Sequence, residues 1–262
     1  MILNLGPSAV KMVACAVVSL FLFLLCGSSA EAQGPQVGST QNPLPIHAYI
    51  EEFFLSEAVR NEDPGELQLT FSSDTRRGLG SNMILEMEYG LTKRLQLSSE
   101  TPYGLSATAN SEVSAGWSTT SLGLQYQIIR SDWPFALTAG MSFGIPVKPG
   151  GEREFEPELL AAKTFRKVQV HASVVADVEE GRPSFQYNLA SVYIGERRWF
   201  PTLEWNGRRL DGKNAWYATP GLYRHFEHRL EVGIGLPLGV GGVASHIGIV
   251  GKMTWEIGGD RD

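Results

Sequence analysis

Apolar and polar side chains alternate with a period of two along most of the chain from Glu66 onward. Leu122, Leu124 and Tyr126, for example, alternate with Gly123 and Gln125. Because successive side chains of a β-strand point to opposite faces, each such segment has one apolar and one polar face. The pattern predicts twelve strands, over residues 66–73, 82–91, 94–103, 117–130, 133–146, 154–165, 168–178, 184–194, 199–208, 215–225, 230–239 and 246–257.

The length of these segments indicates a membrane barrel. Most have about 10 residues or more, as a tilted strand needs to cross a bilayer, whereas soluble strands average about 5 or 6 residues. The connections alternate between longer ones and tight ones such as Thr92-Lys93 and Arg166-Lys167, as external loops and periplasmic turns do. We therefore expect an all-β fold, a closed antiparallel transmembrane up-and-down β-barrel of about twelve strands over residues 66–258. A soluble periplasmic β-sandwich is the alternative, and both features count against it.

One strand fits this pattern badly. Pro220 lies inside the segment 215–225, and a closed barrel has no edge at which a missing N–H is tolerated. We expect either a bulge at Pro220 or a different strand boundary.

A helix is predicted only within residues 47–60, where Ile46, Ile50, Phe53 and Phe54 stand at helix-like spacing. This short amphipathic helix belongs to an N-terminal extension over residues 33–65. It is the one segment that we expect to be able to occlude the lumen. A short tail over residues 259–262 follows the barrel.

Residues 1–32 have the three parts of a secretory signal peptide: Lys11, the apolar run 12–26 and a small-residue site that ends at Ala32. A transmembrane anchor is the alternative, but the run is shorter than the roughly 18–20 residues that span a bilayer. Lipidation at Cys26 is disfavoured because a large leucine precedes it. Both cysteines lie in this segment, so the cleaved chain would contain no thiol.

The charge balance excludes several classes of function. The chain has 22 Lys and Arg against 28 Asp and Glu, a net charge of -6, so it lacks the positive field that nucleic acids require. It has no GxxxxGK[ST], no GxGxxG that opens a helix, no HExxH and no CxxC motif. We therefore expect no cofactor and no NTPase, dehydrogenase or zinc-enzyme activity.

Four stretches resemble the family of outer-membrane transporters named after the MetA pathway of phenol degradation. They are Ser56–Val59 through Pro64–Thr70, Glu88–Leu97 with Pro102-Tyr103, Leu122–Tyr126, and Gly221–Arg224 through Leu230–Leu238. The resemblance implies an outer-membrane barrel that passes hydrophobic compounds. The sequence departs from the family pattern at Thr119–Ser121, where a Gly-Asp pair is expected. It departs again at Gly258–Asp262, where barrels often end on an aromatic residue.

Charged side chains on the polar faces are the candidates to line the lumen. Most are acidic, which in a water-filled pore favours cations or neutral solutes. The alternative is that they interlock as a salt-bridged filling, since a barrel of about 12 strands lies between filled and open sizes. The candidates are Glu66, Glu86, Glu88, Arg94, Glu100, His171, Asp177, Glu204, Arg224, Glu231, Lys252 and Glu256.

Two histidine motifs are considered as a catalytic pair and as a metal site, and we assign both of them structural roles. His171-Ala172-Ser173 resembles the His-x-Ser pair of outer-membrane lipid A deacylases, in which His activates Ser. Val174–Ala176 stands in place of the residues that should follow, and the pair lies on the polar face rather than toward lipid. His225 and His228 flank a turn without a third ligand, which is typical of solvated surface.

Basic residues mark nearly every tight connection, and aromatic residues lie near the strand ends. Two readings remain open for the basic turns: attraction to anionic lipid headgroups, or the ordinary preference of Lys and Arg for solvent. The aromatic residues fit interfacial girdles or plain β-propensity. The basic turn residues are Lys93, Arg94, Arg130, Arg166, Lys167, Arg197, Arg198, Arg224 and Arg229.

These observations predict an exported protein of the bacterial outer membrane, cleaved near Ala32, that acts as a passive channel for small solutes, hydrophobic ones included. Its expected partners are outer-membrane lipid, the barrel-assembly machinery and a solute that the sequence does not identify. A non-transporting structural barrel is the main alternative. A lipid hydrolase that uses His171 and Ser173 is the lesser one.

Overall fold

The structure is a computed structural model of the 262-residue chain. It describes residues 53–59, 61–76, 80–107, 113–117, 119–130, 135–147, 153–179, 182–194, 198–210, 212–226, 229–242, 244 and 247–258. These residues all belong to one compact unit, Pro45–Asp262. The signal peptide predicted over residues 1–32 and the tail predicted over residues 259–262 lie outside the described residues.

Every regular element in the described residues is a β-strand. No described helix is long and apolar enough to cross a membrane. The strands are β1 (Leu67–Arg76), β2 (Gly80–Thr92), β3 (Leu95–Ala107), β4 (Val113–Trp117), β5 (Thr119–Ile129), β6 (Phe135–Pro146), β7 (Glu154–Phe165), β8 (Val168–Glu179), β9 (Arg182–Tyr193), β10 (Trp199–Leu210), β11 (Lys213–Phe226), β12 (Leu230–Gly235), β13 (Leu238–Gly242) and β14 (Gly248–Ile257).

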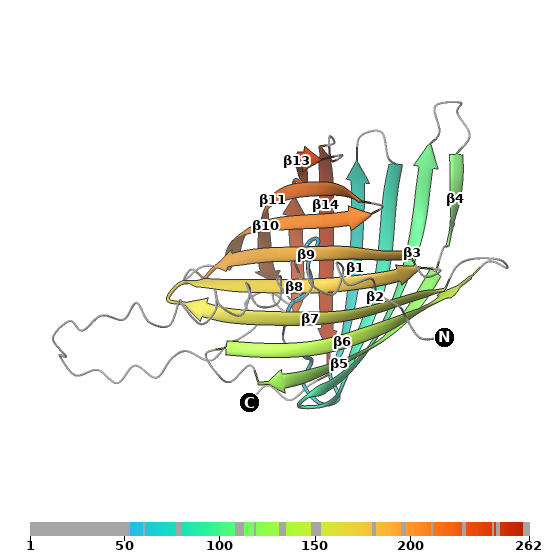
Figure 1. Cartoon of the computed structure of the whole chain (residues 1–262). Coiled ribbons are helices and arrows are strands. Elements are labelled where there is room, and N and C mark those ends of the chain that lie inside the picture. The colour runs from blue at the N-terminus through green and yellow to red at the C-terminus, as the bar shows by residue number, and fades with distance from the viewer. Residues whose placement is uncertain are drawn as a thin grey trace, which may run out of the picture. The chain divides into compact units, whose positions relative to one another are not determined.

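The strands form one closed antiparallel barrel with 12 strand positions, and we call each position a stave (Figure 1). β4 and β5 both pair with β3, and β12 and β13 both pair with β11, so each couple is one interrupted stave. Pairing of β1 with β14 joins the first stave to the last. The sheet of described strands therefore closes on itself and has no edge strand at either end. The predicted fold class and the number of strands are confirmed.

The two faces of the barrel have the opposite polarity to those of a soluble protein. In β5, Leu124, Tyr126 and Ile128 are exposed, while Gln125 and Gln127 are buried. The same inversion occurs in β14, where Trp255 is 50% exposed and Glu256 is buried. Such a surface is stable only against hydrocarbon, because water would leave its apolar side chains unburied.

The strict alternation of loop lengths is absent. The connections at 77–79, 180–181 and 211–212 are short although external loops were expected there, while 130–134 and 194–198 are longer than tight turns. The strands continue past their apolar stretches as paired polar ends, with Asp74 opposite Asn82 and Arg76 opposite Gly80. Apolar periodicity reports where a strand meets lipid, not where its hydrogen bonding ends.

The irregularity expected at Pro220 lies mainly in the partner strand. β11 runs through Pro220, and the opposite stave is interrupted between β12 and β13, beside Leu236. The Leu236 N–H donates to the Pro220 carbonyl at 3.0 Å. A register shift follows between Trp216 and Tyr217.

The helix predicted within residues 47–60 is wrong over residues 53–59, which form bends instead; residues 47–52 and 60 lie outside the described part. Backbone N–H groups of Phe54 and Leu55 donate to the Glu204 carboxylate rather than along the segment. Phe53 and Phe54, the two described members of the helix-like pattern, both pack their rings in one buried apolar cluster. A partner from a distant strand therefore overrides the local pattern.

We predict that Leu124→Arg lowers the free energy of unfolding in lipid vesicles by about 2–4 kcal/mol, because a charge near the membrane midplane must be desolvated. Leu124 lies at the centre of β5 on its exposed face. Ile128→Arg, at the end of the same face, is the matched control and should cost about 0–1 kcal/mol. Urea titration followed by tryptophan fluorescence measures both. Equal costs at the two positions would contradict a membrane-spanning β5.

Candidate functional site in the barrel lumen

Residues 53–59 and 61–66, which precede β1, fold back into the lumen, and we call them the plug. A turn at Asp63–Glu66 connects the plug to β1, with Gly65 at a φ of 82°. The Gly65 N–H donates to the Gly90 carbonyl at 2.8 Å, and the Gly90 N–H donates to Glu66 at 3.0 Å. A Cβ at Gly90 would lie 2.2 Å from the Asp63 carbonyl oxygen, so only glycine lets the plug cross β2 here. Two of the stretches that carry the family resemblance therefore meet at this crossing.

Aromatic side chains fix the inner end of the plug. Phe53 is fully buried, and Phe54 stacks on Tyr223 with ring centroids 4.4 Å apart. A Cβ on Gly221 would lie 2.1 Å from the Phe54 ring. Glycine at this position of the barrel therefore leaves room for the Phe54 side chain. The barrel residues of this apolar cluster are Ala190, Val192, Phe200, Tyr223 and Val250.

A second apolar contact involves Val59 of the plug. It packs with Ala136, Leu160 and Ala162, all buried. These barrel residues occupy inward positions, where the other side chains are mostly polar. Apolar residues on the polar face were the sequence signal for a docked segment, and the sequence analysis did not use it.

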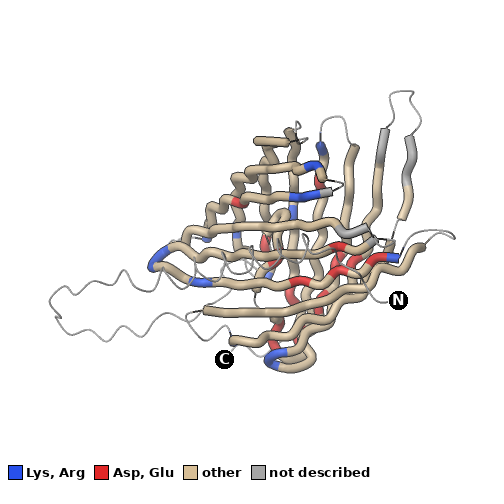
Figure 2. Tube along the Cα trace, in the orientation of Figure 1, with Lys and Arg blue, Asp and Glu red and all other residues tan. Residues whose placement is uncertain are grey.

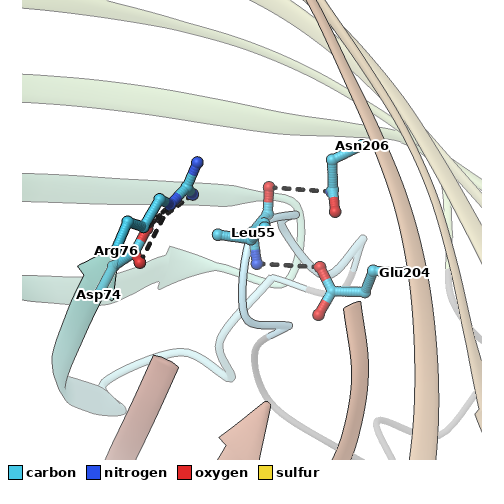
Figure 3. A network of polar contacts seen from close by, with 5 residues as sticks. All are labelled: Leu55, Asp74, Arg76, Glu204 and Asn206. Atoms are coloured by element: carbon cyan, nitrogen blue, oxygen red, sulfur yellow. Dashed lines mark hydrogen bonds and ion pairs between the residues drawn. The ribbon is translucent and has the colours of Figure 1, made fainter. Parts of the chain in front are cut away.

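Glu204 is the main polar anchor of the plug (Figure 3). Its carboxylate accepts hydrogen bonds from the Phe54 N–H at 2.8 Å, the Leu55 N–H at 2.9 Å and the Ser56 hydroxyl at 2.9 Å. The side chain is fully buried. One carboxyl group thereby satisfies three donors that would otherwise be buried without a partner, so this contact orders three consecutive plug residues.

Other inward side chains bind the plug backbone along its length. Lys252 Nζ donates to the Phe53 carbonyl at 2.8 Å. The Thr138 hydroxyl donates to the Val59 carbonyl at 2.9 Å, and the Glu62 N–H donates to Gln96 Oε1 at 2.7 Å. The barrel therefore supplies partners for backbone groups that form neither helix nor sheet, as burial requires.

Two carboxylates near the C-terminal end of the plug, Glu66 and Glu88, also form hydrogen bonds inside the lumen. Arg229 donates to Glu66 Oε1 at 3.2 Å. Gln68 donates to Glu88 Oε2 at 2.6 Å, and Gln96 contacts the other oxygen of Glu88. The plug and its partners therefore fill the half of the lumen nearest the start of β1 and the end of β14.

A cavity of about 300 Å³ lies beyond the plug, toward the opposite end of the barrel. Phe54 and Leu55 contribute apolar surface to its lining, and Lys252 is its cationic side chain. The acidic positions on β2, β3 and β7 are among the red segments of Figure 2. Five carboxylates surround the cavity, a negative potential that attracts cations: Glu57, Glu86, Glu100, Glu156 and Glu158.

The structure places most predicted lumen residues on the inner face. Glu66, Glu88, His171, Asp177, Glu204, Glu231, Lys252 and Glu256 are buried, and Glu86 and Glu100 line the cavity. Arg94 instead lies exposed in the turn between β2 and β3. Arg224 lies over the rings of Trp199 and Phe226, both exposed on the outer face. Both faces of β11 contain aromatic residues, so the alternation alone does not show which face of this strand points into the lumen.

Glu57, Glu156 and Glu158 are cavity residues that the sequence analysis missed. Glu156 and Glu158 share the inward face of β7 with Leu160 and Ala162. That face is polar at one end of the strand and apolar at the other, which obscures its alternation. Glu57 reaches the cavity only because the plug folds back.

His171, Ser173 and His225 have other partners than those their motifs suggested: His225 Nε2 contacts Glu231 Oε2, and His228 lies outside the described residues. His171 Nε2 lies 3.0 Å from Gln169 Oε1, and the ring packs against Phe53. The Ser173 hydroxyl accepts a hydrogen bond from Asn188 at 2.9 Å. Among the described residues, no group of three or more His, Cys, Asp or Glu side chains is arranged to bind a metal ion.

The fold is that of a closed 12-strand antiparallel β-barrel, the architecture of outer-membrane barrels. No protein-family model and no curated relative matches the chain. An outer membrane channel from Pseudomonas putida F1 has a TM-score of 0.61 at 12% identity, over 76% of this chain and 98% of that one. The KdgM porin has 0.57 at 10%, over 72% and 98%. The NanC porin has 0.53 at 11%, over 71% and 98%. At these identities the likeness concerns the fold.

We predict that Glu204→Gln loosens the plug, because an amide accepts fewer N–H bonds and is uncharged. Ala58→Cys provides a reporter, since Ala58 is buried in the plug and both native cysteines precede residue 33. Labelling by a membrane-impermeant maleimide should accelerate about ten-fold, the effect of losing about 1.5 kcal/mol of charge-assisted hydrogen bonding. Glu156→Gln, which removes a cavity carboxylate off the plug, is the control and should leave the rate unchanged. A rate insensitive to Glu204→Gln would show that the plug does not depend on this anchor.

Proposed function

We propose that this protein is a passive channel of the bacterial outer membrane for small solutes, closed in its resting state by the plug. The observation that supports this most directly is the acid-lined cavity of about 300 Å³ in series with a plug that is bound by discrete side-chain anchors. A barrel with a purely structural role would have no need of a displaceable segment. The mechanism of the proposed channel is passive diffusion through the lumen.

The cavity carboxylates give the proposed pore a preference for cations. Glu86, Glu100 and Glu158 face a water-accessible space, and rings of carboxylates select cations in channels. Lys252 is the opposing charge, and it also binds the plug. The preference should therefore appear when the plug moves and the cavity becomes continuous with the other end.

Hydrophobic solutes are the finer part of the proposal, and they rest on the resemblance to the MetA-pathway transporters. Two of the resembling stretches, at Pro64–Thr70 and Glu88–Leu97, meet where the plug crosses β2. The resemblance therefore includes the element that closes the lumen. Phe54 and Leu55 add an apolar surface to the cavity, which suits solutes with an apolar part.

Export with cleavage near Ala32, insertion by the barrel-assembly machinery and contact with outer-membrane lipid complete the proposed function. The second candidate is a non-transporting envelope barrel, which is favoured by one observation: plug residues such as Phe53 and Val59 are fully or almost fully buried in the lumen. Electrical recording separates the two candidates, because only a channel conducts.

We predict that the folded barrel in planar bilayers shows brief cation-selective openings, and that Glu204→Gln raises the open probability about ten-fold by weakening the plug. Adding Glu86→Gln, Glu100→Gln and Glu158→Gln to this variant should shift the reversal potential toward non-selectivity. Asp74→Asn, which removes a carboxylate paired with Arg76 away from the cavity, is the matched control.

Silence from the wild type and from the Glu204→Gln variant, both confirmed as folded by heat-modifiable mobility, would refute the channel and favour the structural barrel. Openings whose selectivity ignores the three glutamates would retain the channel and refute the acidic cavity as its filter.

A further inference from the structure

We infer that the end of the barrel at which β1 begins and β14 ends is an electrostatic binding surface for anionic phospholipid headgroups. We call this surface the basic rim; it consists of Lys93, Arg94, Arg130, Arg166, Lys167, Arg198 and Arg229, with Arg224 just above it. The inference rests on the outer-membrane location in the proposed function, but not on conduction of any solute.

Charge is distributed unequally between the two ends of the barrel. The five connections at the basic rim, residues 93–94, 130–134, 166–167, 194–198 and 227–229, contain eight Lys and Arg and three Asp and Glu. The six connections at the opposite end contain three and four, respectively. The whole chain has a net charge of -6, so the positive rim runs against the overall composition. A general preference of Lys and Arg for turns would have enriched both ends.

Four side chains of the rim, those of its two tight turns, are exposed. They are Lys93, Arg94, Arg166 and Lys167, and both turns are among the blue segments of Figure 2. At the opposite end, Arg76 is bound by Asp74 at 2.6 Å and Arg208 by Asp177 at 3.4 Å, while Arg153 and Lys213 are exposed. At the rim, Arg229 is paired with Glu66 at 3.2 Å.

Backbone conformation at the rim adds an independent observation. Arg166 and Arg229 have φ values of 53° and 59°, and they are the two non-glycine residues with positive φ in the described part of the chain. Glycine or asparagine adopts this conformation at lower cost. Both strained positions are arginine and both lie at the same end, so the charge is maintained where the local backbone disfavours a long side chain.

The depth of the rim matches the phospholipid headgroups. Exposed aromatic residues lie within a few residues of the turns on β2, β9, β10, β11 and β14, as interfacial girdles do: Tyr89, Tyr193, Trp199, Phe226 and Trp255. Arg224 lies 4.9 Å from the centroid of Trp199 and 4.7 Å from that of Phe226. Its guanidinium is therefore already at the boundary between hydrocarbon and headgroups, where a phosphodiester is within reach.

Anionic lipid is the occupant that this arrangement favours. The basic residues are spread around a circumference rather than gathered on one face, so a single folded partner would meet few of them. Lipid headgroups surround the barrel at this depth, and each rim cation adds an attraction that falls off within a Debye length. Barrels with an even number of strands have both chain ends on the periplasmic side, where the leaflet consists of phospholipid.

The test uses spin-labelled lipids with the folded full-length barrel in phosphatidylcholine bilayers. The wild type should restrict spin-labelled phosphatidylglycerol about three-fold more strongly than spin-labelled phosphatidylcholine at low salt, with the preference lost near about 0.5 M NaCl. Arg166→Gln with Lys167→Gln should reduce this preference, and adding Lys93→Gln and Arg94→Gln should abolish it. Arg153→Gln with Lys213→Gln, exposed cations at the opposite end, is the matched control and should leave it unchanged.

Arg166→Asn separates binding from folding. Asparagine relieves the positive φ, so the unfolding midpoint should stay at or above that of the wild type while the phosphatidylglycerol preference falls. A preference unchanged in the fourfold variant, or reduced equally by the control pair, would overturn the inference. So would co-sedimentation of the wild type with peptidoglycan that the fourfold variant loses while its lipid preference persists.

Discussion

The rest of the structure depends on one constraint: within hydrocarbon, every backbone N–H and C=O must find a partner inside the protein. Pairing of β1 with β14 meets this constraint by removing the last open edge. Closure in turn creates an enclosed inner face, which can be polar because lipid never reaches it.

The polar inner face makes the plug possible. A segment without regular structure carries unpaired backbone groups, and an apolar lumen would leave them unsatisfied. Glu204, Lys252, Thr138 and Gln96 satisfy several of them. Apolar patches around Tyr223 and Leu160 set the register of the segment by accepting Phe54 and Val59. Polar anchors of this kind can be exchanged for water, whereas a fully apolar plug would be costly to displace.

The two charged regions of the molecule follow from the same geometry but serve different surroundings. Carboxylates on β2, β3 and β7 face one cavity because antiparallel staves present alternate residues to the lumen. The arginines and lysines of the basic rim lie where the chain turns, outside the lumen, and meet the membrane boundary. An acidic interior and a basic rim therefore coexist in a chain whose overall charge is only moderately negative.

The sequence by itself determined the barrel, its twelve staves and the polarity of most strand positions, because a period of two is set by each strand alone. It did not determine the plug. The spacing of Ile46, Ile50, Phe53 and Phe54 suggested a helix. Only the approach of Glu204, 150 residues away from Phe54, directs the N–H groups of Phe54 and Leu55 elsewhere. The phase of β11 and the place of Arg224 were likewise decided in space, because both faces of that strand contain aromatic residues. Contacts between distant segments have no periodicity along the chain, and for that reason only the tertiary structure shows them.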